Sequence, residues 1–247
     1  MRSNVSCHAT EIAGGRHGIA SLSSIRVIAC YGKGEPIYSE LDSPDHWYCV
    51  VSGAVRKYTV LSDGRRRIVD FMFPGDYFGF RGPHYQYFAT DALSDETIVA
   101  HYPRRSIEAA LDRDPRLARE LCEIAFDAIS RSHARLLILG RVRSVEKVAA
   151  FLAEMAERCL NRRERTIVLP MSRYDIADYL ALSVETVSRA LTRLRRERAI
   201  RFVDKHRISI LDGHLLDGRQ IDEHEPEKIA RAGETLTAVK AGRDGNP

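Results

Sequence analysis

The feature that most constrains the fold is a change of pattern near Asp114, where short strand-like runs give way to one long helical run. From Ile25 to Tyr102, short segments rich in β-branched and aromatic residues alternate with turn residues, which is typical of a β-sandwich or barrel. The helical run begins with Asp114 as N-cap and Pro115 at the first helical position, and it ends at Gly140. The sequence therefore predicts an α+β protein in which a β-rich unit leads into a long helix.

Recognisable turns divide the β-rich unit into strands. The segment "WYCVVSGAVRKYTV" predicts two strands separated by Ser52-Gly53, "SDG" at residues 62–64 predicts a hairpin turn, and "RRIVDFMF" predicts the following strand. We expect residues 25–113 to form a β-roll. Residues 1–24 are polar and show no periodicity, so we expect a flexible N-terminal arm.

The helix over residues 114–140 is predicted to be a dimerisation helix. At about 1.5 Å per residue it would be about 40 Å long, more than a small roll needs to cover one face. In its first half, apolar residues recur at the spacing of a coiled-coil seam, formed by Leu117, Leu121, Ile124 and Ala128. We predict that this seam is the dimer interface; packing of the helix on its own sheet is the alternative.

The charge of the chain is concentrated in one segment. Residues 1–140 carry 17 Lys+Arg and 17 Asp+Glu, whereas residues 141–214 carry 16 Lys+Arg and 10 Asp+Glu. Such asymmetry is expected where one domain meets a polyanion, although a solvated basic face has the same composition. A chain of 247 residues with 44% hydrophobic content is long enough for two packed domains, each with its own core.

Residues 141–214 have the pattern of a winged helix-turn-helix. Ser172 and Asp175 resemble a capping box that starts a short helix, and residues 181–183 have the length of a tight turn. Ser183 can cap a second helix, whose inward face would hold Val187, Leu191 and Leu194. The segment 201–211 reads as a hairpin with a basic tip. In such a motif the second helix enters the major groove of DNA.

The outward face of the second helix has side chains suited to base edges. Arg189 can donate a bidentate pair to guanine, Glu185 can accept from cytosine, and Ser188 can bond either kind of partner. Val184 can contact a thymine methyl group. The alternative is an intrahelical salt bridge between Glu185 and Arg189, four residues apart.

Phosphate contacts are predicted for hydroxyl and basic side chains near the turn, the reading helix and the wing. These residues are Ser172, Arg173, Ser183, Thr186, Arg193, Lys205 and Arg207, with Arg195, Arg196 and Arg198 as further basic candidates.

This combination resembles the CRP/FNR superfamily of bacterial transcription regulators, and more narrowly its FixK-type members. The resemblance covers residues 25–211, where "YCVVSGAVRKYTVLSDGRRRIVDFMFPGDYFGF" is similar to the family roll and "ETVSR" is similar to the FNR-type reading helix. It implies that Glu185, Ser188 and Arg189 read TTGA-like half-sites. Cyclic-AMP receptor protein has Arg where this chain has Val184, so its TGTGA-type preference is not implied.

The resemblance also raises the question of a bound signal. The family's cyclic-nucleotide site uses a Glu after Gly for the ribose, where this chain has Asp76, and an Arg-Ser or Arg-Thr pair for the phosphate, where an ungapped alignment places Tyr87 and Phe88. Without its Arg, an anionic phosphate loses its charge-assisted partner. We therefore predict that no cyclic nucleotide binds in the family manner.

Other cofactors find little support in the sequence. The five cysteines are scattered without a CxxC pair, so neither a disulfide framework, a zinc site nor the closely spaced iron–sulfur ligands of FNR are expected. Haem bound through His84, His101 or another His is left open.

The sequence as a whole predicts a homodimeric regulator, without cofactor or metal, that binds a DNA palindrome with half-sites about 10 bp apart. The resemblance adds DNA bending, contact with RNA polymerase, activation and a link to nitrogen fixation. Enzyme motifs such as a phosphate loop, GxSxG or HExxH are absent from the sequence. With no signal-peptide core and no run of about 20 apolar residues, a cytoplasmic protein without membrane association is expected.

Two alternatives remain: a ligand-responsive sensor of the same superfamily, with haem or a small molecule in the roll, and a nucleotide-sensing module for another partner. Residues 215–247 form an acidic C-terminal extension without a predicted function, with a short helix expected around residues 226–238.

Overall fold

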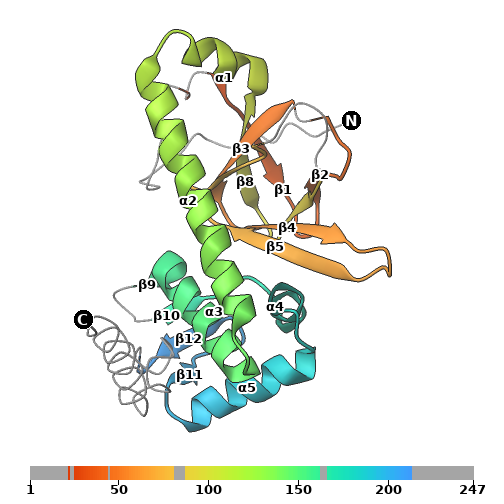
Figure 1. Ribbon diagram of the computed structural model, residues 1–247, viewed down its shortest axis with the longest axis vertical. Helices are drawn as coiled ribbons and strands as arrows, with labels where there is room; N and C mark the ends of the chain where they lie inside the picture. The colour runs from red at the N-terminus through yellow and green to blue at the C-terminus, as the bar shows by residue number, and fades with distance from the viewer. Residues whose placement is uncertain (1–21, 23–24, 44, 81–86, 162–165, 213–247) are drawn as a thin grey trace, which may run out of the picture.

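The computed structural model describes residues 22, 25–43, 45–80, 87–161 and 166–212. A β-roll lies at one end, the long helix α2 runs along the molecule, and a small helical unit with its own sheet lies at the other end (Figure 1). The C-terminal extension and its expected helix lie outside the described residues, as does most of the predicted arm. Leu22, within that arm, is buried against the roll and α2, so the arm is not free throughout its length.

The roll consists of two four-stranded antiparallel sheets, as the strand and turn pattern predicted. One sheet has the order β1 (Val27–Tyr31), β8 (Thr97–Pro103), β3 (His46–Ser52), β6 (Tyr77–Phe78). The other has the order β2 (Pro36–Tyr38), β7 (Ala89–Ala92), β4 (Val55–Val60), β5 (Arg66–Met72). The two strands predicted on either side of Ser52-Gly53 thus lie in different sheets.

Gly53 makes this change of sheet possible. Its φ is +82°, and a Cβ atom at this position would lie 2.6 Å from Thr97 Oγ1. Only glycine tolerates both the left-handed backbone and the close approach. The turn therefore closes the roll.

A short helix that the sequence did not predict, α1 (Arg104–Leu111), follows the roll. Ile107 is its buried residue, and the N-cap Pro103 makes no side-chain cap hydrogen bond. Ile107 packs on the core together with Ala110 and Leu111, a stripe of only three residues, and the helix start carries no capping side chain, so the sequence signal is short.

Helix α2 (Pro115–Gly140) has the predicted bounds, and the Asp114 side chain accepts a hydrogen bond from the Arg116 backbone N–H at 2.9 Å. The predicted dimer seam, however, lies mostly in the chain's own core. Leu117, Leu121 and Ile124 are 1%, 9% and 4% exposed and pack with the roll, and Ala128 is half-buried. These side chains have little surface left for a second subunit, so the assignment of the interface to this stripe is corrected.

A different apolar stripe of α2 is exposed. Its residues lie on the side of the helix away from the buried stripe: Phe126, for example, follows Ile124 by two positions, about 200° around the helix. Its largest members are Phe126 (66% exposed), Ile129 (50%), Leu136 (65%) and Leu137 (76%).

The C-terminal unit contains α3 (Ser144–Cys159), α4 (Arg173–Leu180) and α5 (Val184–Arg196). Its antiparallel sheet has the order β11 (Ile200–Phe202), β12 (Arg207–Ile210), β10 (Thr166–Val168), β9 (Leu160–Asn161). The predicted helix-turn-helix and wing are therefore confirmed in outline.

The roll and the C-terminal unit share one hydrophobic cluster, contrary to the expectation of separate cores. Ile68 and Phe71 of β5 are fully buried in the same cluster as Phe151 of α3 and Tyr179 of α4. The rings of Phe71 and Tyr179 lie 5.1 Å apart. Burial of apolar side chains from both units in one cluster stabilises the position of one unit relative to the other. Within the described residues, no helix is both long enough and apolar enough to cross a membrane.

Candidate DNA-binding surface

The first helix of the helix-turn-helix begins with the predicted capping box. Ser172 Oγ accepts from the Asp175 N–H at 3.1 Å, and Asp175 Oδ2 accepts from the Ser172 N–H at 2.9 Å. The Ser172 hydroxyl also donates to Asp175 Oδ2 at 2.7 Å. Ser172, predicted to contact phosphate, therefore already uses its hydroxyl within the cap.

A tight turn joins α4 to the reading helix α5. Ala181 adopts φ +55°, and the Leu182 N–H donates to the Ala177 carbonyl at 3.0 Å. Ser183 then caps α5 by accepting from the Thr186 N–H at 3.2 Å, while its hydroxyl lies 2.9 Å from that of Thr186. The turn leaves little freedom in the direction of α5 relative to α4.

The two faces of α5 are divided as the sequence predicted. Its buried residues are Val187, Ala190, Leu191 and Leu194. Glu185, Ser188 and Arg189 are exposed on the opposite face, near the N-terminal end of the helix. Val184 differs from the prediction because it is half-buried and packs against the core.

Glu185 and Arg189 are both available to a ligand. In the described part of the chain no ion pair within 4 Å joins them, so the alternative of an intrahelical salt bridge is not realised. The backbone N–H at the helix start, the Ser183 hydroxyl and the charge of Arg189 together hold the pKa of Glu185 below its usual range. At neutral pH Glu185 is therefore a hydrogen-bond acceptor and Arg189 a donor.

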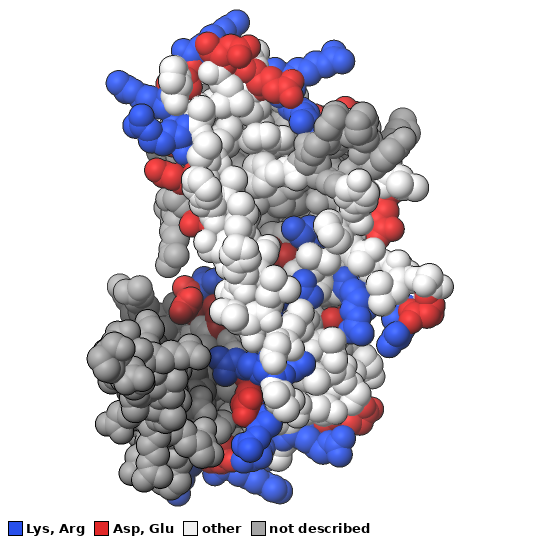
Figure 2. Space-filling model, in the orientation of Figure 1, with Lys and Arg blue, Asp and Glu red and all other residues white. Residues whose placement is uncertain are grey.

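The predicted phosphate-binding cations lie on α4, α5 and the wing. Arg193 pairs with Glu197 at 2.7 Å and Arg207 with Asp204 at 2.6 Å, and Lys205 is exposed. Because exposed pairs contribute only about 0–1 kcal/mol, both arginines can exchange their carboxylates for phosphate. Figure 2 shows Lys and Arg side chains at the lower end of the molecule, where Figure 1 places α5.

The Phe202 ring of β11 supports two of the basic side chains. The Arg173 guanidinium lies 5.0 Å from the centre of this ring, and that of Arg195 lies 6.0 Å away. Partial burial lowers the pKa of Arg173. Stacking on an aromatic face restricts these long side chains to the surface between helix and wing.

The residues at the positions of the family's cyclic-nucleotide site make other contacts in this chain. Asp76, at the ribose position, accepts from the Phe73 N–H at 2.8 Å and from Arg158 of α3 at 2.6 Å. Tyr87, at the phosphate position, is exposed, and the ring of Phe88 lies 5.7 Å from Lys57 Nζ. The Oδ2 oxygen of Asp76, at the ribose position, is therefore already bonded within the chain.

The interior of the roll is packed with aromatic rings. Tyr48 lies 5.2 Å from both Tyr38 and Phe78, and His101 lies 4.9 Å from Tyr48. His101 Nε2 is also within 2.8 Å of the Tyr31 hydroxyl, so this nitrogen is engaged. His84, the other named haem candidate, lies outside the described residues.

A cavity of about 490 Å³ lies outside the roll, between its 73–77 turn, α2 and α3. Arg131 and Arg158 in its wall both pair with Asp76, at 3.6 and 2.6 Å, and the wall also carries Asp127, Glu154 and Glu157. It is a space near the roll from which the alternative of a small-molecule sensor can be argued.

Together the features above define a winged-helix DNA-binding protein fused to a roll of the cyclic-nucleotide-binding type. Residues 29–114 match the family model of the cyclic nucleotide-binding domain, and residues 146–218 match that of the Crp-like helix-turn-helix domain. The nitrogen fixation regulation protein FixK of Rhizobium meliloti is 42% identical over 200 residues, which cover 81% of this chain and 90% of that protein.

Further relatives agree with this match. The FixK protein of Bradyrhizobium diazoefficiens is 40% identical over 184 residues, covering 74% of this chain and 77% of that protein. The solved structure of FixK2 from Bradyrhizobium japonicum is 39% identical, with a TM-score of 0.73, and covers 78% of this chain and 96% of that one. The chain belongs to the CRP/FNR family of transcription regulators and, within it, is of the FixK type. Its relatives are DNA-binding regulators rather than enzymes.

Proposed function

We propose that the chain is a homodimeric transcription activator that reads a palindrome of TTGA-like half-sites through α5. The observation that carries this proposal is the exposed set Glu185, Ser188 and Arg189 on the N-terminal half of α5, with exposed basic side chains on the same helix and on the wing. Their donor and acceptor chemistry matches base edges in the major groove. Contact with RNA polymerase, a cytoplasmic location and a role in regulating nitrogen fixation belong to the same proposal.

We propose that the dimer forms when the exposed stripe of α2 packs against the same stripe of a second copy of this chain. Single exposed apolar residues are common on protein surfaces, but here four large ones lie on one helix: Phe126, Ile129, Leu136 and Leu137. An exposed apolar stripe of this kind is typical of an interaction surface. Pairing of this stripe about a two-fold axis buries it and places two reading helices on one DNA molecule.

Cys122 offers a direct test of that pairing. It is exposed and lies one turn from Phe126 on α2. If two α2 helices pair in parallel, mild oxidation will cross-link the dimer through Cys122, and the Cys122→Ser variant will not cross-link. Cross-linking that persists in this variant would place the interface elsewhere.

We further propose that neither a cyclic nucleotide nor an iron–sulfur cluster is needed for DNA binding. The engagement of Asp76 by Arg158 and the packed aromatic interior of the roll support this. Cys49 and Cys159 are not exposed, and burial raises the pKa of each to about 12, which disfavours the thiolate that a metal requires.

The decisive experiment measures the affinity of the purified protein for a labelled TTGA-N6-TCAA duplex and for a scrambled duplex at fixed salt. The measurement is made without ligand, with cyclic AMP and with haem. Tight, specific binding that no addition changes supports the proposal. Specific binding only after an addition would favour the ligand-responsive alternative, and no specificity under any condition would overturn the assignment of α5.

A further inference from the structure

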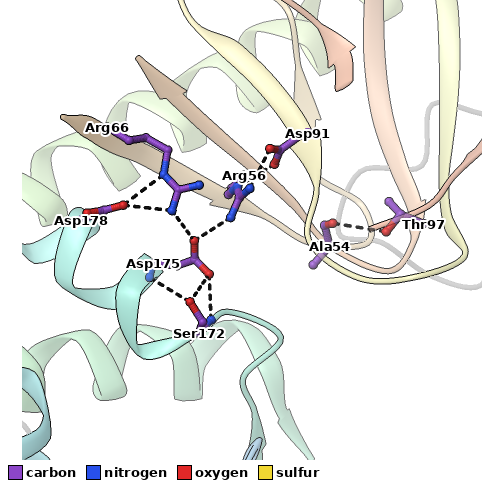
Figure 3. Close-up of polar contacts among 8 residues, drawn as sticks. All are labelled: Ala54, Arg56, Arg66, Asp91, Thr97, Ser172, Asp175 and Asp178. Atoms are coloured by element: carbon purple, nitrogen blue, oxygen red, sulfur yellow. Dashed lines mark hydrogen bonds and ion pairs between the residues drawn. The ribbon is translucent and has the colours of Figure 1, made fainter. Parts of the chain in front are cut away.

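Asp175 joins the helix-turn-helix to the roll through its two carboxylate oxygens (Figure 3). Oδ2 belongs to the capping box of α4, as described above. Oδ1 accepts from Arg56 at 2.7 Å and from Arg66 at 2.8 Å, two arginines on neighbouring strands of the roll. The residue that starts the first helix of the DNA-binding motif is therefore also the one that the roll holds.

The two arginines are themselves fixed in the roll. Arg56 forms a two-point pair with Asp91, Nε to Oδ1 at 2.6 Å and the terminal nitrogen to Oδ2 at 2.8 Å, across the β4–β7 pairing. Arg66 bonds Asp178 of α4 as well as Asp175, at 3.0 Å. Both guanidinium groups lie within 6 Å of the Tyr58 ring, at 5.9 and 5.8 Å. Such planar, multiply bonded contacts fix orientation as well as distance.

The contact lies at a largely buried position. Asp175 has 6% of its side chain exposed, Arg56 17% and Arg66 29%. Burial by itself would raise the pKa of Asp175, but hydrogen bonds from Ser172 and the charges of Arg56 and Arg66 lower it overall. The carboxylate is therefore ionised at neutral pH, where it can pair with both arginines.

A fixed α4 also fixes the reading helix. The turn at Ala181 sets α5 on α4, and Arg135 of α2 connects the same parts, donating to the Val69 carbonyl of β5 at 2.6 Å and to the Tyr179 carbonyl of α4 at 3.3 Å. The roll, the long helix and the reading helix are thereby held in one arrangement.

We propose that Arg56 and Arg66 of the roll are positioning residues for DNA recognition, which act through Asp175 to set the reading helix at the orientation that a palindrome requires. The inference rests on the proposed function, because orientation matters only if two linked reading helices must match two half-sites. The latch formed by Arg56, Arg66, Asp175 and Asp178 holds α4, and with it the reading helix, in one orientation relative to the roll. When only a fraction of molecules holds that orientation, the apparent affinity falls by the same fraction.

The test compares Arg66→Ala with Arg65→Ala on the same hairpin. Arg65 pairs with Asp63 at the exposed tip of the hairpin and makes no recorded contact with α4 among the described residues, which makes it a matched control. Affinities are measured for the full palindrome, for palindromes whose spacer is shortened or lengthened by one and two base pairs, and for a duplex with one half-site. Urea unfolding is measured alongside.

We expect Arg66→Ala to weaken palindrome binding by about tenfold and to flatten the dependence on spacer length, while half-site binding stays within about twofold of wild type. Arg65→Ala should match the wild type in palindrome affinity, spacer dependence and half-site affinity. Equal losses on the half-site and the palindrome, or an unchanged spacer profile in Arg66→Ala, would overturn the inference.

A second variant guards against simple loss of folding. Asp178→Asn removes one partner of Arg66 from α4 while leaving both roll arginines and Asp175 in place. It should shift the spacer profile in the same direction by a smaller amount, and an unchanged profile would count against the latch. A wild-type protein that binds the palindrome no better than the half-site would overturn the proposed function itself, an outcome distinct from a failure of the variants.

Discussion

The junction between the roll and α4 and the reading face of α5 use the same residue types in opposite ways. At the junction, arginines and carboxylates are buried and bonded to one another, with Asp175 only 6% exposed on its side chain. On the reading face and wing, Arg193 and Arg207 are 61% and 45% exposed, and their partners Glu197 and Asp204 are 43% and 45% exposed. Buried pairs are costly to break and so hold geometry, whereas exposed pairs exchange readily with a ligand.

The largest effect is expected for Arg189, whose loss should reduce specific DNA affinity but not the stability of the fold. Arg189→Ala should weaken binding to the palindrome by about 2–6 kcal/mol, because each of two bidentate guanine contacts discriminates by about 1–3 kcal/mol. Binding to a scrambled duplex and the free energy of unfolding should change little, since Arg189 is exposed. Electrophoretic mobility shifts and urea unfolding check both, and equal losses on the two duplexes would place Arg189 on phosphate instead.

The next largest effect is expected on the free energy of unfolding, at Asp175 between the roll and α4. Asp175→Asn should lower the free energy of unfolding at pH 7 by about 3 kcal/mol, the lower part of the range for breaking a buried ion pair. Hydrogen bonds and the two arginines outweigh burial and hold the pKa of Asp175 below its usual value. The stabilisation is therefore fully present above the unfolded pKa of about 3.9 and is lost as the pH falls through the folded pKa.

Urea unfolding of wild type and Asp175→Asn at a series of pH values tests this sign. The difference between them should be constant from pH 7 to about pH 5 and should shrink below pH 4. Asp63→Asn, at the exposed hairpin tip, is the matched control and should leave stability unchanged. A difference that grows on acidification would contradict the assignment.

A smaller effect is expected at the start of the reading helix. Ser183→Asp keeps an N-cap acceptor, so the helix should remain folded. Its negative charge near a phosphate should weaken specific and random DNA binding alike, by about tenfold at low salt. Loss confined to the specific duplex would mean that Ser183 lies away from the phosphates.

The smallest effect is expected on the wing. Lys205 is exposed at its tip, and Lys205→Ala should weaken binding by less than about tenfold on all sequences. The slope of log affinity against log salt should fall by about one for each phosphate contact removed. An unchanged slope would show that the wing tip does not contact DNA.

Much of the fold follows from local patterns in the sequence. The capping box of Ser172 and Asp175 and the inward residues Val187, Leu191 and Leu194 were all predicted, because caps and periodicity act over three or four residues. The exposed Glu185, Ser188 and Arg189 follow from the same periodicity. Helix α1 was missed because its apolar stripe spans only Ile107, Ala110 and Leu111 and its start carries no capping side chain.

What the sequence left open depends on distant contacts. Apolar residues lie on two different sides of α2, and the sequence could not show that Leu117 and Leu121 pack on the roll while Leu136 and Leu137 face outward. Nor does any local pattern pair Asp175 with Arg56, 119 residues away. Spacing along the chain determines which residues share a helix face, because helix geometry is local. Only the tertiary structure decides what that face meets, because burial depends on segments brought together by folding.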